Sequence, residues 1–349
     1  MTTDSSLERL VSEFFAGSCP PEAVTRAEAT GLDTRLWDAA EQLGFPLVGL
    51  DERRGGSGGS LSDLLVLLHV AGRHAAPLPL AETNLAAWLL HRAGRDAPSG
   101  PMTVVPGAER DTLTLREGVL SGVAHGVPWA TGARRVVALL EDENGSLQVV
   151  SPALTELTIH KGSDLAGMSR DTLVARDVPV DAAPWTGTPD ALFVRGALLR
   201  SAQMAGALEE ILELTRDYVG QRTQFGRAIG SFQSVQQHVV TLAQASTMSS
   251  LAVRRAGHAA ATGDASFEVC ATKLVLNQQS ALATRAAHQA HGAIGMTQEY
   301  RLQHFTRRLH GWRGEFGDEQ GLALRIGAAV ARRGGLARVI TAPSATVGV

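Results

Sequence analysis

The chain has 349 residues, of which 44% are apolar and 19% charged, and its formal net charge is −3. A chain of this length needs more than one packed core, and the composition is that of an ordinary globular protein rather than a disordered one. The small net charge and the lack of a basic tract argue against nucleic acid as the main partner, while two cysteines without a CxxC pair argue against a disulfide scaffold or a zinc ribbon.

Residues 1–98 carry the apolar periodicity of helices. The spacing predicts helices over 32–44, 61–75 and 82–94. The intervening DERRGGSGGS, residues 51–60, follows no clear strand and lacks the P-loop and GxGxxG patterns. It therefore favours a flexible turn over a phosphate-binding loop, and we expect an N-terminal helical domain.

Residues 99–187 differ in character from the helices before them. Segments such as TLTLREGVLSGV, RRVVALLE and DTLVARDVPV are short, rich in β-branched residues and separated by turn residues. REG and ENG are hairpin-like turn signals. The region predicts a small middle β-barrel or sandwich of roughly six to eight strands.

Residues 188–349 are helical again. Apolar stripes predict long helices over 197–222, 234–260, 267–292 and about 318–335. Four such helices form an antiparallel bundle, and their alanine-rich faces suit close packing within the chain and against a second subunit. The three consecutive regions together predict an α+β fold.

The sequence gives no sign of export or membrane insertion. Its start, MTTDSSLERLVSEFF, is acidic and lacks the apolar core of a signal peptide. Every apolar run is interrupted before the roughly 18 residues that a bilayer span needs. We expect a cytoplasmic protein without a membrane span.

The stretch RTQFGRAIGSFQSVQ, residues 222–236, concentrates donors and flat rings in a turn that opens a long helix. The planar guanidinium of Arg222 can pair with two phosphate oxygens, and the N-terminus of the following helix favours anions. Phe225 offers a flat apolar face, and Gln224 and Gln233 offer polar contacts without charge. The alternative is that Arg222 caps the preceding helix and the phenylalanines belong to the core.

With two further segments, this stretch resembles the acyl-CoA dehydrogenase family. QAHGAIGMTQEYRLQHFTRRL, residues 289–309, is similar to the family's Gln-x-x-Gly-Gly-x-Gly-x-x-x-Glu-Tyr segment and its arginine-rich helix. EQLGFPLVGLDERRGGSGGSL, residues 41–61, is similar to its N-terminal glycine-rich turn. The resemblance spans nearly the whole chain; it is strong in the C-terminal bundle and weak in the β-domain.

The resemblance implies that the chain binds FAD. It assigns the cofactor contacts to Arg222, Gln224, Phe225, Phe232, Gln233, Gln289, Gly292 and Ala293. In the family, the arginine and the second glutamine reach the flavin of a neighbouring subunit, which implies an oligomer. The family often has Gly-Gly where this chain has Gly292-Ala293. His288 and His291 are three residues apart, but no third ligand is evident, so we expect no metal site.

Family members remove two hydrogens from an acyl thioester, with a carboxylate taking the α-proton. The usual base lies in a Tyr-Glu-Gly-Thr turn, which falls here in HGWRGEFGDEQ, residues 310–320. Matching the glycine puts Phe316 at the base position, whereas a shift of one residue puts Glu315 there, with Asp318 and Glu319 within reach. We predict that Glu315 is the base; the alternative is a solvated acidic turn without a catalytic role.

A minority of the family carry the base on the first helix of the bundle, next to an arginine. The corresponding residue is Val194, which has no carboxylate. The neighbouring Arg195 is predicted to orient the substrate or the base. The alternative is that Arg195 is a surface residue at the start of a helix.

The β-domain departs from the family pattern. The family's Thr-Glu-Pro-x-x-Gly-Ser-Asp loop is missing, and VVPGAERDTLTL, residues 104–115, occupies the corresponding place. The family's Trp-Ile-Thr is echoed by Trp129-Ala130-Thr131. Short members of this kind resemble subunits of bacterial heteromeric enzymes that act on bulky acyl-CoAs, including steroid side chains.

The predicted function is FAD-dependent α,β-dehydrogenation of an acyl-CoA thioester in lipid or steroid metabolism. The predicted partners are an electron-transfer flavoprotein and either further copies of the chain or a homologous subunit, in a homotetramer or heterotetramer. Three alternatives are a non-catalytic partner subunit of a heterotetramer, a flavin oxidase or hydroxylase on the same fold, and a scaffold protein without flavin.

Overall fold

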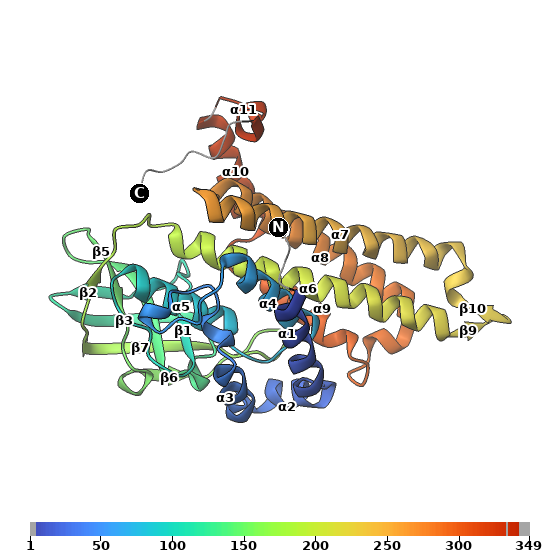
Figure 1. Ribbon diagram of the computed structural model, residues 1–349, viewed down its shortest axis with the longest axis horizontal. Coiled ribbons are helices and arrows are strands. Elements are labelled where there is room, and N and C mark those ends of the chain that lie inside the picture. The colour runs from blue at the N-terminus through green and yellow to red at the C-terminus, as the bar shows by residue number, and fades with distance from the viewer. Residues whose placement is uncertain (1–4, 333, 342–349) are drawn as a thin grey trace. The chain divides into compact units, whose positions relative to one another are not determined.

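The computed structural model describes residues 5–332 and 334–341. Contacts within the chain divide it into two compact units (Figure 1). The bundle unit takes residues 1–21, 65–76 and 197–349, and the sheet unit takes residues 22–64 and 77–196. The order of elements is the predicted one, with helices, then strands, then long helices. The domain boundaries at 98 and 187 stay a prediction.

The N-terminal part is helical, as predicted. Its elements are α1 (Ser5–Ser18), α2 (Pro21–Thr30), α3 (Thr34–Gln42), η1 (Phe45–Leu47), η2 (Glu52–Arg54), α4 (Leu61–Arg73) and α5 (Leu80–Arg92). Asp33 begins α3 by accepting hydrogen bonds from the backbone N–H groups of Arg35 (3.0 Å) and Leu36 (3.3 Å). Gly44, with a φ of 74°, follows its end. Helix α5 is buried around most of its circumference.

Eight strands of the sheet unit form two four-stranded sheets, with the orders β1-β4-β5-β8 and β2-β3-β7-β6. The strands are β1 (Met102–Val104), β2 (Thr114–Arg116), β3 (Val119–Pro128), β4 (Arg135–Glu141), β5 (Leu147–Val150), β6 (Thr158–His160), β7 (Arg170–Pro179) and β8 (Ala183–Pro184), with η3 (Ala130–Gly132) and η4 (Leu154–Glu156) between them. Among the described residues the sheets do not close into a barrel. Of the two predicted alternatives, a barrel and a sandwich, the sandwich therefore remains.

The two hairpin signals are confirmed. Glu117 and Gly118, at φ values of 48° and 74°, join β2 to β3, because a two-residue hairpin turn needs positive φ at its central positions. Gly145, with a φ of 75°, lies in the turn from β4 to β5. Their glycines therefore serve the backbone conformation of the turns.

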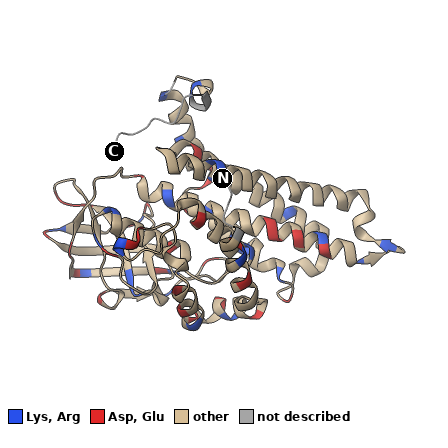
Figure 2. Cartoon of the chain, viewed as in Figure 1, with Lys and Arg blue, Asp and Glu red and all other residues tan. Residues whose placement is uncertain are grey.

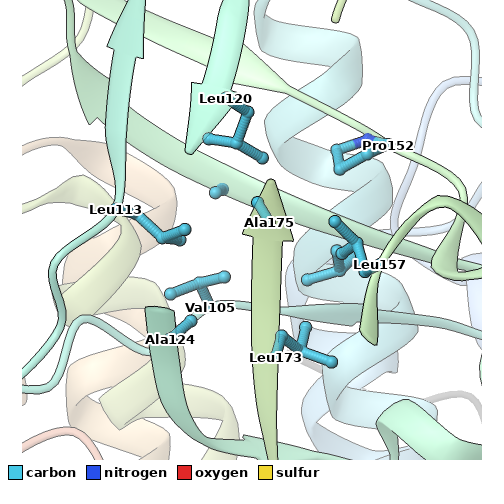
Figure 3. A pocket seen from close by; sticks show the side chains of 10 residues that line it. Val105, Leu113, Leu120, Ala124, Pro152, Leu157, Leu173 and Ala175 are labelled. Carbon is cyan, nitrogen blue, oxygen red and sulfur yellow. The ribbon is translucent and has the colours of Figure 1, made fainter. Parts of the chain in front are cut away.

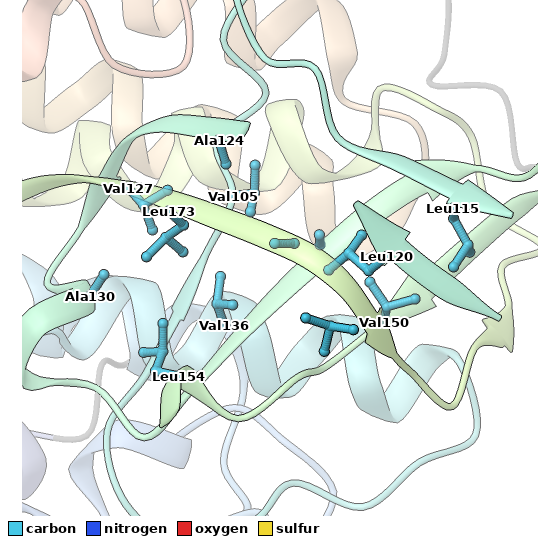
Figure 4. Packing of buried hydrophobic residues seen from close by; sticks show 13 residues of the cluster. Val105, Leu115, Leu120, Ala124, Val127, Ala130, Val136, Val150, Leu154 and Leu173 are labelled. Atoms are coloured by element: carbon cyan, nitrogen blue, oxygen red, sulfur yellow. The ribbon is translucent and has the colours of Figure 1, made fainter. Parts of the chain in front are cut away.

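An apolar core fills the space between the strands of the sheet unit. Leu120, Ala124 and Leu173 come from the paired long strands β3 and β7, and Val136 and Val150 join them from the other sheet (Figure 4). A small cavity within this core is lined by side chains such as Leu113, Leu157 and Val105 (Figure 3). Since its lining is apolar, it offers no partner to a charged cofactor.

The C-terminal part contains the predicted long helices. Its elements are α6 (Ala191–Gln221), β9 (Thr223–Gln224), β10 (Arg227–Ala228), η5 (Ile229–Ser231), α7 (Gln233–Thr262), α8 (Ser266–His291), η6 (Gly292–Met296), α9 (Leu302–Arg313), α10 (Glu319–Arg332) and α11 (Leu336–Thr341). Helix α7 packs on α8, and its buried residues include small ones such as Ala245, Ser249 and Ala256. In the part of the chain that the structure describes, no helix combines the length and apolarity needed to cross a bilayer.

Candidate functional site

A short exposed hairpin joins α6 to α7. Gln224 of β9 pairs with Arg227 of β10, and the backbone N–H of Ile229 donates to the carbonyl of Arg222 at 2.8 Å. Phe225, at a φ of 52°, forms the tip with the following glycine. Arg222 and Gln224 are exposed, and Phe225 is 89% exposed, so this phenylalanine does not belong to the core.

The start of α7 lies beside this tip. Phe232 is the N-cap residue and provides no side-chain acceptor, and Gln233 begins the helix, so the first N–H groups of α7 are not capped by a side chain. The Phe225 and Phe232 rings meet edge to face at 6.1 Å, and the Arg227 guanidinium lies 4.1 Å from the Phe232 ring centre. In Figure 2 the hairpin carries blue, the colour of lysine and arginine, and no red. The guanidinium groups of the hairpin and the uncapped backbone N–H groups of α7 make this end of the bundle favourable to an anion.

The second predicted cofactor segment lies at the same end of the bundle unit. Gln289 is exposed near the end of α8, and Gly292 (φ of 64°) and Ala293 are exposed in η6. The His291 ring stacks on Tyr218 at 4.7 Å, and Tyr218 lies one turn before Arg222. This contact brings together two segments that are far apart in the sequence.

Both ring nitrogens of His291 have hydrogen-bond partners within the fold. Its Nδ1 lies 2.8 Å from the Ala287 carbonyl oxygen, and its Nε2 lies 3.2 Å from the Tyr300 hydroxyl. Burial lowers the pKa of His291, which favours the neutral ring. The described residues contain no group of three His, Cys, Asp or Glu side chains arranged to hold a metal ion.

Glu315 lies in the turn between α9 and α10. Its Oε2 is 2.7 Å from Nη2 of Arg200, and the two side chains are 17% and 4% exposed. The Arg200 guanidinium also lies 5.3 Å from the Trp312 ring centre. The next residue, Phe316, has a φ of 50°, which is a strained conformation for a side chain of this size.

The other two acidic residues of the turn serve α10. Asp318 accepts a hydrogen bond from the backbone N–H of Gly321 at 2.7 Å and is exposed. Glu319 pairs with the guanidinium of Arg313 at 2.6 Å. The turn is therefore not uniformly solvated, since Glu315 is enclosed while Asp318 is exposed.

Two buried residues beneath this turn were missed by the sequence reasoning. Lys273 and Asn277 of α8 are completely buried and contact each other at 2.7 Å. Burial lowers the pKa of Lys273 from 10.5 to about 7, against the attraction of Glu315. A helical pattern offers one signal for Lys273, since it lies on the same buried face as Val269 and Leu276.

The structure does not place Glu315 beside the hairpin. Lys273, under the Glu315 turn, and Gln289, at the hairpin end, are sixteen residues apart on the continuous helix α8. At a rise of 1.5 Å per residue this corresponds to about 24 Å. The bundle unit therefore carries an anion-favouring end and, separately, an ion-paired carboxylate.

Arg195 belongs to the sheet unit and lies against aromatic side chains. Its guanidinium is 4.8 Å from the Trp88 ring centre, and its Nη2 lies 3.5 Å from Oδ1 of Asn84. The Trp88 ring meets that of Trp185 at 5.5 Å. Burial lowers the pKa of Arg195 to about 10, so the side chain remains charged at neutral pH.

The Trp129-Ala130-Thr131 segment forms a fixed turn in the sheet unit. Trp129 has a φ of 57° and is buried against Ala166 and Met168. The buried Asp171 carboxylate accepts hydrogen bonds from the Thr131 N–H (2.8 Å) and the Thr131 hydroxyl (2.9 Å). The Thr131 hydroxyl thus already donates its proton within the fold.

Two family models match the chain. The model described as "Acyl-CoA dehydrogenase, N-terminal domain" matches residues 2–98, and the model described as "Acyl-CoA dehydrogenase, C-terminal domain" matches residues 190–331. The second range contains the hairpin, the segment at Gln289 and the turn that bears Glu315.

Individual proteins agree with the family models. Acyl-CoA dehydrogenase IpdE2 of Mycobacterium tuberculosis is 29% identical over 313 residues, which cover 87% of this chain and 90% of the relative. The ChsE4–ChsE5 complex from Mycobacterium tuberculosis has a TM-score of 0.86 at 22% identity, covering 95% of this chain and 98% of that one. Butyryl-CoA dehydrogenase from Megasphaera elsdenii has a TM-score of 0.84 at 17% identity, covering 95% and 99%. At these identities the two solved structures show a shared fold.

Proposed function

The chain belongs to the acyl-CoA dehydrogenase family, and we propose that it is an FAD-dependent oxidoreductase that forms an α,β-unsaturated acyl-CoA. One observation carries this proposal. At one end of the bundle unit, the exposed Arg222 hairpin and the uncapped start of α7 lie together with the segment that contains Gln289. The acyl group is that of a lipid or a steroid side chain, and the site of action is the cytoplasm.

The residues at the hairpin end fit a flavin dinucleotide. Arg222 offers a bidentate contact to the diphosphate, and the first N–H groups of α7 offer further donors. Phe225 presents an exposed ring for stacking, and Gln224 and Gln233 present amide groups. No Asp or Glu lies between Asp217 and Asp264 to repel the phosphates. When bound, FAD supplies the hydride acceptor of the reaction.

The exposure of these groups supports binding across a subunit boundary. A phenylalanine that is 89% exposed at the tip of a hairpin gains stability only when another surface covers it. Phe232, Gly292 and Ala293 complete the proposed contact face. The partner is a second copy of the chain or a homologous subunit, and electrons leave through an electron-transfer flavoprotein.

Glu315 is the proposed base. Its carboxylate lies 2.7 Å from the Arg200 guanidinium, and its partial burial excludes most water. Arg195, charged and held against Trp88, is the proposed contact for a polar group of the substrate.

A second candidate function is that of a non-catalytic partner subunit. The observation in its favour is the turn itself, where the glycine-anchored match gives Phe316 at the base position while Glu315 is held by Arg200 at 2.7 Å. A single purification distinguishes the two candidate functions. The dehydrogenase is yellow and is bleached by an acyl-CoA without a partner, whereas the partner subunit gains flavin only when it is co-expressed with a homologue.

Replacing Arg222 with alanine is expected to reduce flavin affinity roughly 10- to 100-fold, because a charge-assisted contact to the diphosphate is lost. Flavin absorbance per mole of purified protein measures the effect. Arg216→Ala is the matched control, since Arg216 is an exposed residue of α6, the helix that ends just before Arg222, and pairs with Glu213. Equal flavin content in both variants would remove Arg222 from the cofactor site.

A further inference from the structure

Two side chains of α8 hold both ends of the turn between α9 and α10. Lys273 Nζ donates to the backbone carbonyls of Trp312 (3.0 Å), Arg313 (3.3 Å) and Gly317 (3.3 Å). The Asn277 amide donates to the same Arg313 and Gly317 carbonyls at 3.0 and 3.2 Å. The contacts therefore join the last carbonyls of α9 to the far side of the turn.

These contacts satisfy groups that the helix leaves open. The last carbonyls of an α-helix have no partner within it, and leaving them buried without donors is costly. The turn also contains Phe316 at a φ of 50° and Gly317 at 106°. A backbone in such a conformation persists only where its surroundings fix it.

We propose that Lys273, together with Asn277, is a positioning residue that fixes the turn so that Glu315 is held at Arg200 and available to the reaction. Lys273 is too deeply buried beneath the turn to act on the acyl group itself. The consequence for catalysis rests on the proposed role of Glu315, whereas the connection between α8 and the turn does not.

The charges around Lys273 make this connection depend on pH. Burial lowers its pKa to about 7; Glu315 and Glu319 oppose this shift, and Arg200 and Arg313 add to it. An ammonium has three N–H donors and a neutral amine has two, so the hold on the carbonyls weakens as the pH rises through neutrality.

Global stability responds to pH in the opposite direction. The unfolded lysine keeps its ordinary pKa of 10.5, so the unfolded state binds more protons than the folded state between about pH 7 and 10.5. The free energy of unfolding from this group therefore rises with pH across that window and is at its lowest below it. A positioning role and a purely stabilising role thus give different pH profiles.

Hydrogen exchange at the backbone amides of Gly314 and Glu315 tests the proposal, since both donate within the turn. Lys273→Met keeps the length of the side chain without its donors. In this variant exchange below pH 7, corrected for intrinsic rates, is expected to be at least roughly tenfold faster than in the unchanged protein. The rise of unfolding free energy between about pH 7 and 10.5 is expected to disappear.

Two further variants keep the test decisive. Leu276→Ala, one turn along α8 and completely buried, lowers global stability and should leave exchange in the turn unchanged once it is corrected for global unfolding. Asn277→Leu retains the ammonium, so it should accelerate exchange less and keep the pH dependence. The proposal fails if the turn amides of Lys273→Met exchange no faster than those of the unchanged protein, or if Leu276→Ala accelerates them equally.

The kinetic readout separates this proposal from the proposed function. In an active enzyme, Lys273→Met is expected to slow flavin reduction at saturating acyl-CoA while leaving the half-saturating concentration unchanged. An inactive unchanged protein would contradict the proposed function, yet the exchange measurements would still decide whether Lys273 fixes the turn.

Discussion

Substituting glutamine for Glu315 is expected to slow the reduction of bound flavin by an acyl-CoA roughly 10²- to 10⁴-fold, while the flavin stays bound. Glutamine has the shape of glutamate and can still accept a hydrogen bond from Arg200, but it cannot take a proton from the substrate. Anaerobic rapid mixing measures the rate of bleaching, and flavin absorbance before mixing shows that the cofactor remains.

Glu319→Gln is the matched control for Glu315→Gln. Glu319 follows the same turn and also pairs with an arginine, Arg313, but neither of the two alignments with the family motif puts it at the base position itself. Its substitution should leave the bleaching rate close to that of the unchanged protein. A Glu315→Gln variant that bleaches as fast as the control would move the base to another residue.

Substituting alanine for Gly206 is expected to destabilise the fold by about 3 kcal/mol or more, because helices α4 and α6 cross with their backbones in contact. A Cβ on Gly206 would lie 1.9 Å from the carbonyl oxygen of His69, and one on Gly72 would lie 2.1 Å from that of Gln203. Neither carbonyl is the end of a flexible side chain, so the helices themselves must separate. Urea unfolding followed by circular dichroism gives the free energy.

Gly220 supplies the control within the same helix. An added Cβ there meets no atom within 4 Å, and alanine favours the helix more than glycine does. Gly220→Ala should therefore leave the unfolding free energy unchanged or slightly raised. If Gly206→Ala were as stable as Gly220→Ala, the close helix crossing would be refuted.

Local signals in the sequence predicted most of the secondary structure. The turn at Gly118 and the end of α3 near Gly44 each follow from a glycine at a positive φ. The circumferential burial of α5 was not predictable, because its second buried face depends on elements distant in the sequence. The middle strands were predicted as strands, but their arrangement in two sheets depends on the same long-range pairing.

The candidate site divides in a similar way. Motifs identified Arg222 and Gln289, yet the contact between Tyr218 and His291 that puts their segments together joins parts of the chain more than seventy residues apart. The Arg200–Glu315 ion pair and the Lys273 contacts are also long-range, and Arg200, one of three arginines in α6, gives no local sign of its partner. Lys273 alone carried a signal, as a charge on an apolar helix face.

Anaerobic mixing of the purified protein with acyl-CoAs is the decisive measurement for the proposed dehydrogenation. Butyryl-CoA, palmitoyl-CoA and a steroid side-chain acyl-CoA serve as probes, with and without a co-expressed homologous subunit. The proposed function predicts that the flavin band bleaches with at least one probe and that mass spectrometry finds a product two hydrogens lighter than that acyl-CoA. A protein that retains no flavin alone or with its homologue, or flavin that no acyl-CoA reduces, would contradict it.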